Sequence, residues 1–277
     1  MTNKVSPIKI QLQEDLPNLP DKNGYFESFL GNFEQNILTF QFLDRHFLRL
    51  SKSINRQKNQ IAEIFIETIK NHFFDKLKIF DQQKQNSIKL FRFRLWSNGL
   101  DFILDIAPFK SRFNPVISNE QITAKLVIMN ESRDKSGKYT PALESINSFN
   151  YAKQNGFDEA LLINKDNLVT ESSWCNFYYV IDGIVFLSGL GLNGIAQEVL
   201  TDLIIDKSKM KVKAITISEL LENKYPCFLT NAIYGVIPIS QIDNVNFSSD
   251  SLIDKIKLDF NKLKNSTIET IWIQINS

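Results

Sequence analysis

The sequence has few cysteines and no excess of either charge. Cys175 and Cys227 are the only cysteines among 277 residues, so there is no disulfide framework, and a reducing cytoplasm is the expected compartment. The 32 lysine and arginine residues nearly balance 31 acidic ones, which argues against nucleic acid or an anionic membrane as the partner. No apolar run is long enough to span a bilayer, and the polar segment from Met1 to Leu12 does not resemble a signal peptide. These absences predict a soluble cytoplasmic protein.

The length and hydrophobicity of the chain predict two modest domains. With 277 residues and 43% hydrophobic content, it can bury a full core. The first part alternates strands and helices and predicts a small α+β domain over residues 1–118. Its predicted elements are strands at 25–30 and 36–40 around a polar turn at Gly31-Asn32, helices at 43–54 and 61–74, and strands at 88–96 and 101–106.

A polar segment over residues 109–121, interrupted by Pro115, marks the expected boundary to a larger domain at 119–277. Thr140-Pro141 is typical of a helix start, with threonine as the N-cap and proline in the first turn, and Gly156 would end that helix. The other predicted elements are strands at 122–129, 158–164, 169–177, 212–217, 227–230 and 236–239, helices at 194–206, 218–222 and 250–263, and an apolar tail at 268–275.

The stretch from Lys138 to Gln197 carries the strongest functional pattern. A lysine precedes the predicted helix, a glutamate lies in an apolar strand, and a glycine leads into a second helix. A lysine amine can form an imine, a buried carboxylate can face a pyridine nitrogen, and free N–H groups at a helix start can bind phosphate. These are the three parts needed to hold pyridoxal 5'-phosphate.

Several segments resemble sequence motifs of the class IV, fold-type IV pyridoxal-phosphate enzymes. This family includes branched-chain and D-amino-acid aminotransferases and aminodeoxychorismate lyase. Val-Thr-Glu-Ser-Ser from Val169, followed by Asn176-Phe177, is similar to the family's Val-Thr-Glu-x-x-x-x-Asn-Phe pattern. His46-Phe-Leu-Arg49-Leu resembles its His-x-x-Arg-Leu signature, and Tyr25-Phe-Glu resembles its Phe-Glu-Thr strand. The resemblance implies an α+β, two-domain fold-type IV architecture, with a β-barrel-like C-terminal domain.

The resemblance also implies roles for individual residues. Glu171 would face the pyridine nitrogen and keep it protonated. Arg49 would bind the cofactor phosphate with its permanently charged fork of donors. Asn176 would help to fix the strand that carries Glu171.

Two later segments are also similar to the family. Gly194-Ile195-Ala196 resembles its Gly-Ile-Thr turn, in which backbone N–H groups bind phosphate, although Ala196 lacks the threonine hydroxyl and Gln197 stands where many members have arginine. Thr230-Asn231, followed by Val236-Ile-Pro-Ile, resembles a late segment whose polar residues contact phosphate or substrate. The resemblance predicts that Arg49 and the N–H groups of Ile195 and Ala196 meet at one phosphate.

Two lysines compete for the Schiff base that the resemblance implies. Lys138 lies at about the family's usual spacing before Glu171, in coil just ahead of the predicted Thr140 N-cap. Lys135 begins Lys-Ser-Gly-Lys-Tyr-x-Pro, whose wording is closer to the family's and would place Tyr139 at the cofactor's phenolic oxygen. That register needs about one extra helical turn, so we predict Lys138 and keep Lys135 as the alternative.

The expected reaction is that of an aminodeoxychorismate lyase, which eliminates pyruvate to give 4-aminobenzoate for folate biosynthesis. The absence of the Lys-x-Gly-Gly-Asn-Tyr wording of branched-chain aminotransferases favours the lyase. A class IV aminotransferase acting on D- or branched-chain amino acids is the alternative, and a non-catalytic relic of the family is a third. In each catalytic case the partner is an amino-acid-like substrate, no metal is needed, and the family implies a homodimer.

Overall fold

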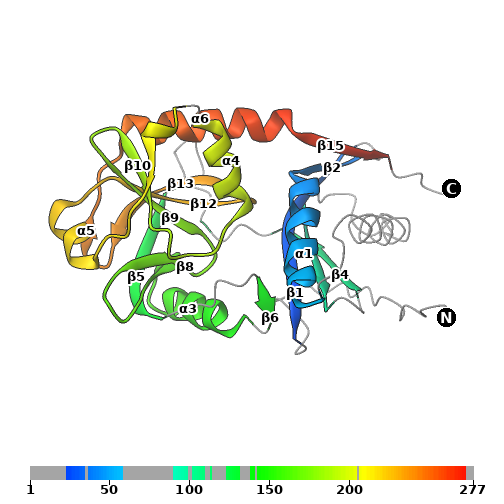
Figure 1. Ribbon diagram of the computed structural model, residues 1–277, viewed down its shortest axis with the longest axis horizontal. Helices are drawn as coiled ribbons and strands as arrows, with labels where there is room; N and C mark the ends of the chain where they lie inside the picture. The colour runs from blue at the N-terminus through cyan, green and yellow to red at the C-terminus, as the bar shows by residue number, and fades with distance from the viewer. Residues whose placement is uncertain are drawn as a thin grey trace. The chain divides into compact units, whose positions relative to one another are not determined.

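The computed structural model describes residues 23–34, 37–58, 90–98, 102–109, 113, 123–131, 138–140, 142–204 and 206–272. These residues fall into two compact units, and most of their helices and strands are labelled in Figure 1. The first unit takes those within Met1–Lys110, Gly137–Pro141 and Lys264–Ser277, and the second takes those within Ser111–Ser136 and Ala142–Leu263. The chain therefore returns to the first unit twice after leaving it. Domains at 1–118 and 119–277 stay a prediction.

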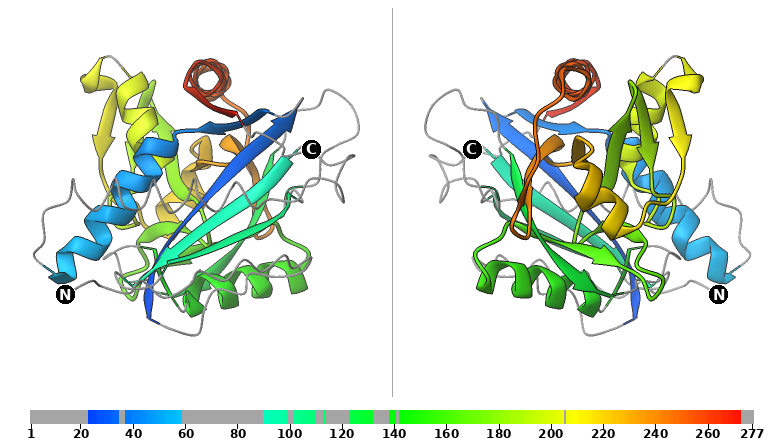
Figure 2. Two further views of the ribbon diagram at one scale, coloured as in Figure 1. Left: turned by 90° about the vertical axis from the view of Figure 1, so that its right-hand side faces the viewer. Right: turned by 90° about the vertical axis from the view of Figure 1, so that its left-hand side faces the viewer.

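The first unit is built on a mainly antiparallel sheet in the order β15-β2-β1-β3-β4, with β6 pairing the start of β1. Figure 2 shows β1, β3 and β4 running side by side. The strands are β1 (Gly24–Glu34), β2 (Ile37–Gln41), β3 (Leu90–Ser97), β4 (Phe102–Pro108), β6 (Tyr139–Thr140) and β15 (Ile268–Trp272). The predicted strands of this unit are confirmed, and the apolar tail adds a strand beside β2.

The predicted turn at Gly31-Asn32 is wrong, because both residues lie inside β1. A Cβ atom at Gly31 would lie 2.4 Å from the Phe93 ring and 2.9 Å from the Phe40 ring. The glycine therefore serves close packing of aromatic rings on the strand, which a sequence reading confuses with a turn signal.

Helix α1 (Leu43–Lys58) packs on this sheet, in contact with β1 (Figure 1). The predicted helix is confirmed: Leu43, Phe47, Leu50 and Ile54 are each 1% exposed and join one core cluster with the sheet. Leu48, which was predicted to share this spacing, is 39% exposed instead. Burying each side chain of the core cluster contributes about 1.5–3 kcal/mol. This packing fixes which residues of α1 face β1, and it therefore positions the polar residues described below.

The second unit contains a nine-stranded sheet in the order β11-β10-β9-β12-β13-β5-β7-β8, with β14 paired to β13. Its strands are β5 (Ala124–Asn130), β7 (Glu159–Ile163), β8 (Val169–Ser172), β9 (Asn176–Ile181), β10 (Ile184–Leu187), β11 (Met210–Val212), β12 (Cys227–Asn231), β13 (Gly235–Ile242) and β14 (Val245–Asn246). Its helices are α3 (Leu143–Gln154), α4 (Ile195–Leu203), α5 (Ile217–Asn223), the short 3-10 helix η1 (Lys207–Lys209) and α6 (Ser251–Ser266), whose last residues belong to the first unit.

Helix α3 belongs to the crossover between the parallel strands β5 and β7. Parallel neighbours require such a connection. The helix packs on β7, where buried Ala152 meets Val127, Ala160 and Leu162. It ends as predicted, with Gly156 at a φ of +80°, a left-handed conformation that favours glycine.

Several predicted elements of the second unit need correction. The segment predicted as one strand over residues 169–177 is two strands, β8 and β9, because Ser172 N–H donates to Cys175 O at 2.8 Å and closes a turn. Strand β10 was not predicted. The strand predicted at 212–217 lies earlier, at Met210–Val212, and shares only Val212 with the predicted range. Farther along, Ile215 O accepts from Val169 N–H, and α5 begins at Ile217.

The predicted α+β class is confirmed, with a smaller six-stranded sheet in the first unit and a larger nine-stranded sheet in the second. The helix predicted at 61–74 lies outside the described residues. Within the residues that the structure does describe, none of the helices has the length and apolar character required to cross a membrane.

Candidate functional site

The predicted site residues divide between the two units, and each group is described by itself. In the first unit, β1 supplies Glu27, and α1 supplies His46 and Arg49 one helical turn apart. Arg49 Nε donates to Glu27 Oε1 at 2.6 Å, and Arg49 Nη2 donates to Glu27 Oε2 at 2.5 Å. His46 Nδ1 lies 2.8 Å from the same Oε2. The arginine predicted to bind phosphate is thus held in a bidentate ion pair with Glu27.

Burial and charge act in opposite directions on Glu27, which is 2% exposed. Burial by itself favours the neutral acid, but the Arg49 charge and the hydrogen bonds from His46 and Arg49 outweigh it and lower the pKa of Glu27 to about 2. The carboxylate is therefore ionised at neutral pH and accepts hydrogen bonds only.

His46 is equally buried, and burial lowers its pKa despite the neighbouring Glu27. The charges of Arg49 and Lys138 lower it further. The ring is therefore neutral at neutral pH, with its one proton on Nδ1 facing the carboxylate, and its Nε2 is buried with no hydrogen-bond partner among the described residues.

Lys138 belongs to the first unit and lies beside β1. Its carbonyl oxygen accepts from Phe26 N–H at 2.9 Å, and its Nζ lies 5.8 Å from the centroid of the Phe26 ring. Lys138 is half-buried and precedes β6, outside any helix or strand. Lys135 lies outside the described residues, so the choice between the two lysines stays a prediction.

The helix start predicted at Thr140 is wrong. Tyr139 and Thr140 form β6, which pairs with Gly24 and Tyr25. Helix α3 begins only at Leu143, after Ala142, and no side chain caps it. The pairing with β1 holds the Thr140 backbone extended, and the Tyr139 ring packs edge-on against Tyr25 at 5.4 Å between centroids.

In the second unit, Glu171 lies on β8 and is 4% exposed. Its Oε2 accepts from the backbone N–H of Leu192 at 3.1 Å. A Cβ atom at Gly191 would lie 2.9 Å from the Glu171 Cβ and 3.1 Å from its Oε2, so a glycine at 191 lets the loop approach the carboxylate. The predicted glutamate is thus buried and oriented by main chain.

Asn176, at the start of β9, holds the same loop from its other side. Its Nδ2 donates to Leu192 O at 2.5 Å, so Leu192 is fixed through both its N–H and its carbonyl. A Cβ atom at Gly194 would lie 2.1 Å from Asn176 Oδ1. We therefore define the loop Gly191–Gly194 as the glycine loop, and both of its glycines are required by close contacts.

The glycine loop leads directly into α4, whose first residues, Ile195 and Ala196, are buried. Gly194 is the N-cap, in an extended conformation, and its carbonyl accepts from Glu198 N–H at 3.1 Å. The first N–H groups of a helix have no partner within the helix and favour an anion. Gln197 Nε2 donates to Asn193 Oδ1 at 3.5 Å, back onto the glycine loop.

Thr230 and Asn231 lie at the end of β12, where Thr230 pairs with Asn176 across the sheet. Asn231 Nδ2 donates to Trp174 O at 2.9 Å and its Oδ1 accepts from Ile233 N–H at 2.8 Å, so this side chain organises two turns. The hydroxyls of Thr230 and Tyr178 are buried and have no hydrogen-bond partner of normal geometry among the described residues. Burial raises the pKa of Tyr178 well above its usual value, and the nearby Thr230 opposes this.

Sequence reasoning missed Glu159, the first residue of β7, which is fully buried. Its Oε2 accepts from the Ser172 hydroxyl at 3.3 Å and from Trp174 N–H at 3.1 Å, so it supports the turn that follows Glu171. The sequence does contain a signal for it, because Glu159 directly precedes the apolar run over residues 160–163. All five residues of β7 prove to be buried, and a buried carboxylate needs partners.

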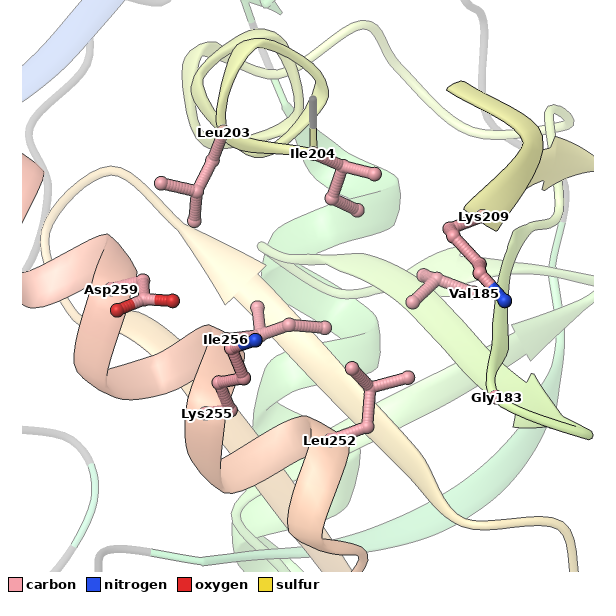
Figure 3. Close-up of a pocket in the computed structure, with 9 residues that line it drawn as sticks. All are labelled: Gly183, Val185, Leu203, Ile204, Lys209, Leu252, Lys255, Ile256 and Asp259. Carbon is pink, nitrogen blue, oxygen red and sulfur yellow. The ribbon is translucent and has the colours of Figure 1, made fainter. Parts of the chain in front are cut away.

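A cavity of about 410 Å³ lies elsewhere in the second unit. Figure 3 shows that Leu203 and Ile204 at the end of α4 face Leu252 and Ile256 of α6, while Lys209 extends past Val185. None of the predicted cofactor residues lines this cavity. Among the residues that could be searched, no group of three or more potential metal ligands is found.

Comparison with known proteins gives relatives along most of the chain. Two provisionally named branched-chain-amino-acid aminotransferases are similar: one from Rickettsia felis, 26% identical over 80% of this chain and 81% of that one, and one from Rickettsia bellii, 25% identical with the same shares. Among solved structures, a provisionally named 4-amino-4-deoxychorismate lyase from Legionella pneumophila is 22% identical, with a TM-score of 0.66, over 93% of this chain and 99% of that one. A branched-chain aminotransferase from Thermoproteus uzoniensis, solved with norvaline, is 19% identical, with a TM-score of 0.68, over 89% of each chain.

The two structural likenesses show the fold. The family assignment comes from the model of amino-transferase class IV, which matches residues 24–242. That range contains the Glu27 pair, the Glu171 strand, the glycine loop and the end of β12. This chain belongs to the class IV aminotransferase family of enzymes.

Proposed function

We propose that this protein binds pyridoxal 5'-phosphate and eliminates pyruvate from 4-amino-4-deoxychorismate to give 4-aminobenzoate. The observation that carries the cofactor proposal is the buried Glu171 carboxylate, held by Leu192 N–H beside a glycine loop that opens α4. A carboxylate for a ring nitrogen on β8 then lies beside the short loop that leads to a set of backbone donors for a phosphate at the start of α4.

The residues present suit the chemical groups of this cofactor. When bound, pyridoxal phosphate supplies an aldehyde that condenses with amines and a pyridinium ring that accepts electrons from the substrate. Glu171 holds the proton on the ring nitrogen, and the N–H groups of Ile195 and Ala196 bind phosphate. Thr230 offers a buried hydroxyl beside that of Tyr178, with no hydrogen-bond partner of normal geometry among the described residues, and such an atom suits a ligand oxygen. Arg49, with its side chain 15% exposed, supplies a permanent positive charge for phosphate.

The lysine has two tasks in this proposal. Its amine would hold the cofactor covalently, and the same amine, when free, would move the proton at the carbon that bears the substrate's amino group. Lys138 is the residue that we assign, and Lys135 remains the alternative. The homodimer that the family resemblance implies stays a prediction.

The lyase is favoured over the aminotransferase by two observations. The chain lacks the Lys-x-Gly-Gly-Asn-Tyr wording, and its likeness to the Legionella protein spans nearly the full length of both chains. A branched-chain aminotransferase is the second candidate, supported by the two curated Rickettsia relatives. Both reactions would require removal of the proton from the carbon that bears the substrate's amino group, and they differ in the bonds that change afterwards.

The test begins with the absorbance spectrum of the purified protein. We expect a band from lysine-bound cofactor that disappears on borohydride reduction, with the pyridoxyl group mapped to the peptide of Lys138. Lys138→Ala should lose the adduct and Lys135→Ala should keep it. An adduct on Lys135 would reverse the lysine assignment, and an adduct on neither residue would favour the non-catalytic alternative.

Substrate assays then separate the two reactions. Pyruvate release from 4-amino-4-deoxychorismate supports the lyase. Formation of glutamate from 2-oxoglutarate and a branched-chain or D-amino acid, with no pyruvate release from the chorismate derivative, would replace it with the aminotransferase.

A further inference from the structure

The ion pair of Arg49 leaves the guanidinium little freedom. Two parallel hydrogen bonds, Nε to Oε1 at 2.6 Å and Nη2 to Oε2 at 2.5 Å, define both the plane and the direction of the fork. An unrestrained arginine side chain carries about 2 kcal/mol of rotamer entropy, which would oppose binding of an anion. The orientation of Arg49 therefore depends on the orientation of the Glu27 carboxylate.

His46 fixes that carboxylate. Its Nδ1 lies 2.8 Å from Oε2, the oxygen that also accepts from Arg49 Nη2. Because Glu27 is ionised, it has no proton to give, so the hydrogen in this contact belongs to the histidine. Rotation of the carboxylate would break the His46 bond together with one bond to Arg49.

The surroundings of His46 keep it a donor rather than an acid or a base. Glu27 from β1, Arg49 from its own helix and Lys138 are the charged groups that act on it. A protonated ring would add a third cation to Arg49 and Lys138 in a buried site. The Phe29 ring lies 5.2 Å from the imidazole between centroids and contributes to its enclosure.

We propose that Glu27 and His46 are positioning residues for phosphate binding: His46 donates one hydrogen bond that orients Glu27, and Glu27 orients the guanidinium of Arg49. This inference rests on the proposed function, in which Arg49 binds the phosphate of the cofactor. Neither residue needs to touch the cofactor, and the essential property of His46 is a donor at the Nδ1 position.

The experiment compares His46→Asn, which places an amide donor close to where Nδ1 lies, with His46→Leu, which has similar bulk and no donor. Binding of pyridoxal phosphate is followed by absorbance after the cofactor has been removed and added back, and binding of inorganic phosphate is followed by calorimetry. We expect His46→Leu to weaken both by about 10-fold or more, the equivalent of one charge-assisted hydrogen bond. His46→Asn should bind both ligands within about threefold of the native protein.

Two further variants complete the design. Glu27→Asp keeps the charge but shortens the side chain by one methylene, so it should weaken the binding of both ligands. It tests the positioning role even if His46→Leu fails to fold. Lys52→Met, at an exposed position of α1, is the matched control and should leave both affinities unchanged. Circular dichroism checks that each variant is folded.

Arg49→Ala, measured in parallel, separates this inference from the proposed function. If Arg49→Ala keeps its affinity for both ligands, Arg49 does not bind phosphate, and the assignment fails at that earlier step. If Arg49→Ala weakens them while folded His46→Leu or Glu27→Asp binds normally, only the positioning roles are overturned. Equal losses in His46→Asn and His46→Leu would overturn the role of the donor.

Discussion

Two buried glutamates, one in each unit, are held in opposite ways. Glu27 is surrounded by side-chain partners on α1, Arg49 and His46, whereas Glu171 accepts from the main-chain N–H of Leu192. A side-chain partner is lost with a single substitution, but a main-chain donor persists whatever side chain stands at 192. The first arrangement depends on residue identity, and the second depends on backbone path and on glycine.

In the proposed site, this difference makes phosphate binding by the second unit depend little on its departures from the family's sequence motifs. Ala196 lacks the hydroxyl of the family's threonine, and Gln197 replaces an arginine and donates to Asn193. Neither change alters the N–H groups at the start of α4, which Gly194 and Asn176 hold in place. Glu27 and Arg49 differ in this respect, because the charge and the shape of their pair come from the side chains themselves.

The largest expected effect is that of Glu171→Gln, which tests whether main-chain support preserves a site after its charge has been removed. The amide keeps the shape of the side chain but cannot hold a ring nitrogen protonated. We expect cofactor binding to survive while turnover falls by about 100-fold or more, as when other preorganised electrostatic groups are removed. Steady-state kinetics on fully loaded enzyme measure this.

Glu222→Gln, at an exposed position of α5, is the control and should change nothing. Near-normal turnover of Glu171→Gln would show that another group faces the ring nitrogen.

Much of both regions could be predicted from the sequence, because local patterns determined them. The helical spacing of Leu43, Phe47 and Leu50 gave α1, and the Val-Thr-Glu wording selected a glutamate that proves to be buried. Other features depended on distant contacts. Thr140 reads as an N-cap, but its backbone pairs with β1, more than a hundred residues earlier in the chain.

Glycine was the other main difficulty for prediction, because the sequence does not show why a glycine is required at a given position. Gly31 makes room for the rings of Phe93 and Phe40, whereas Gly194 makes room for Asn176. Glu159 was overlooked because its partners depend on a turn: Ser172 ends β8 and Trp174 lies in the turn after it, in a segment that was predicted to be strand throughout.

The next effect in size is that of Gly194→Ala, which challenges the glycine-dependent side of the comparison. The added Cβ would lie 2.1 Å from Asn176 Oδ1, although the φ of −88° suits any residue, so the cost comes from the clash alone. Overpacking of this kind costs about 1–3 kcal/mol. Urea unfolding should show that loss in the free energy of unfolding. Calorimetry should show weaker binding of phosphate.

Asn176→Ala provides the matched background for this substitution. By itself it removes the bond to Leu192 O and should cost about 1 kcal/mol. The double variant should then be more stable than the sum of the two losses predicts, because the clash has gone. Additive losses would mean that Asn176 is not what excludes a side chain at 194.

The smallest effect concerns the pH dependence of the side-chain arrangement. The pKa of His46 is lowered in the fold, so at pH values below about 6.5 the unfolded chain takes up a proton that the folded chain refuses. Acidification therefore destabilises the fold, by at most about 1.4 kcal/mol per pH unit for one group. Glu27 adds a loss in the same direction only below pH 4.5, as the pH falls towards its pKa of about 2.

Between pH 6.5 and 5, His46→Asn should consequently lose less stability than the native protein in urea unfolding. The other histidine, His72, is common to both proteins and cancels in the difference. If Glu27 instead held His46 as a cation, the native protein would gain stability over the variant on acidification, and the neutral donor that we assign to the first unit would be wrong.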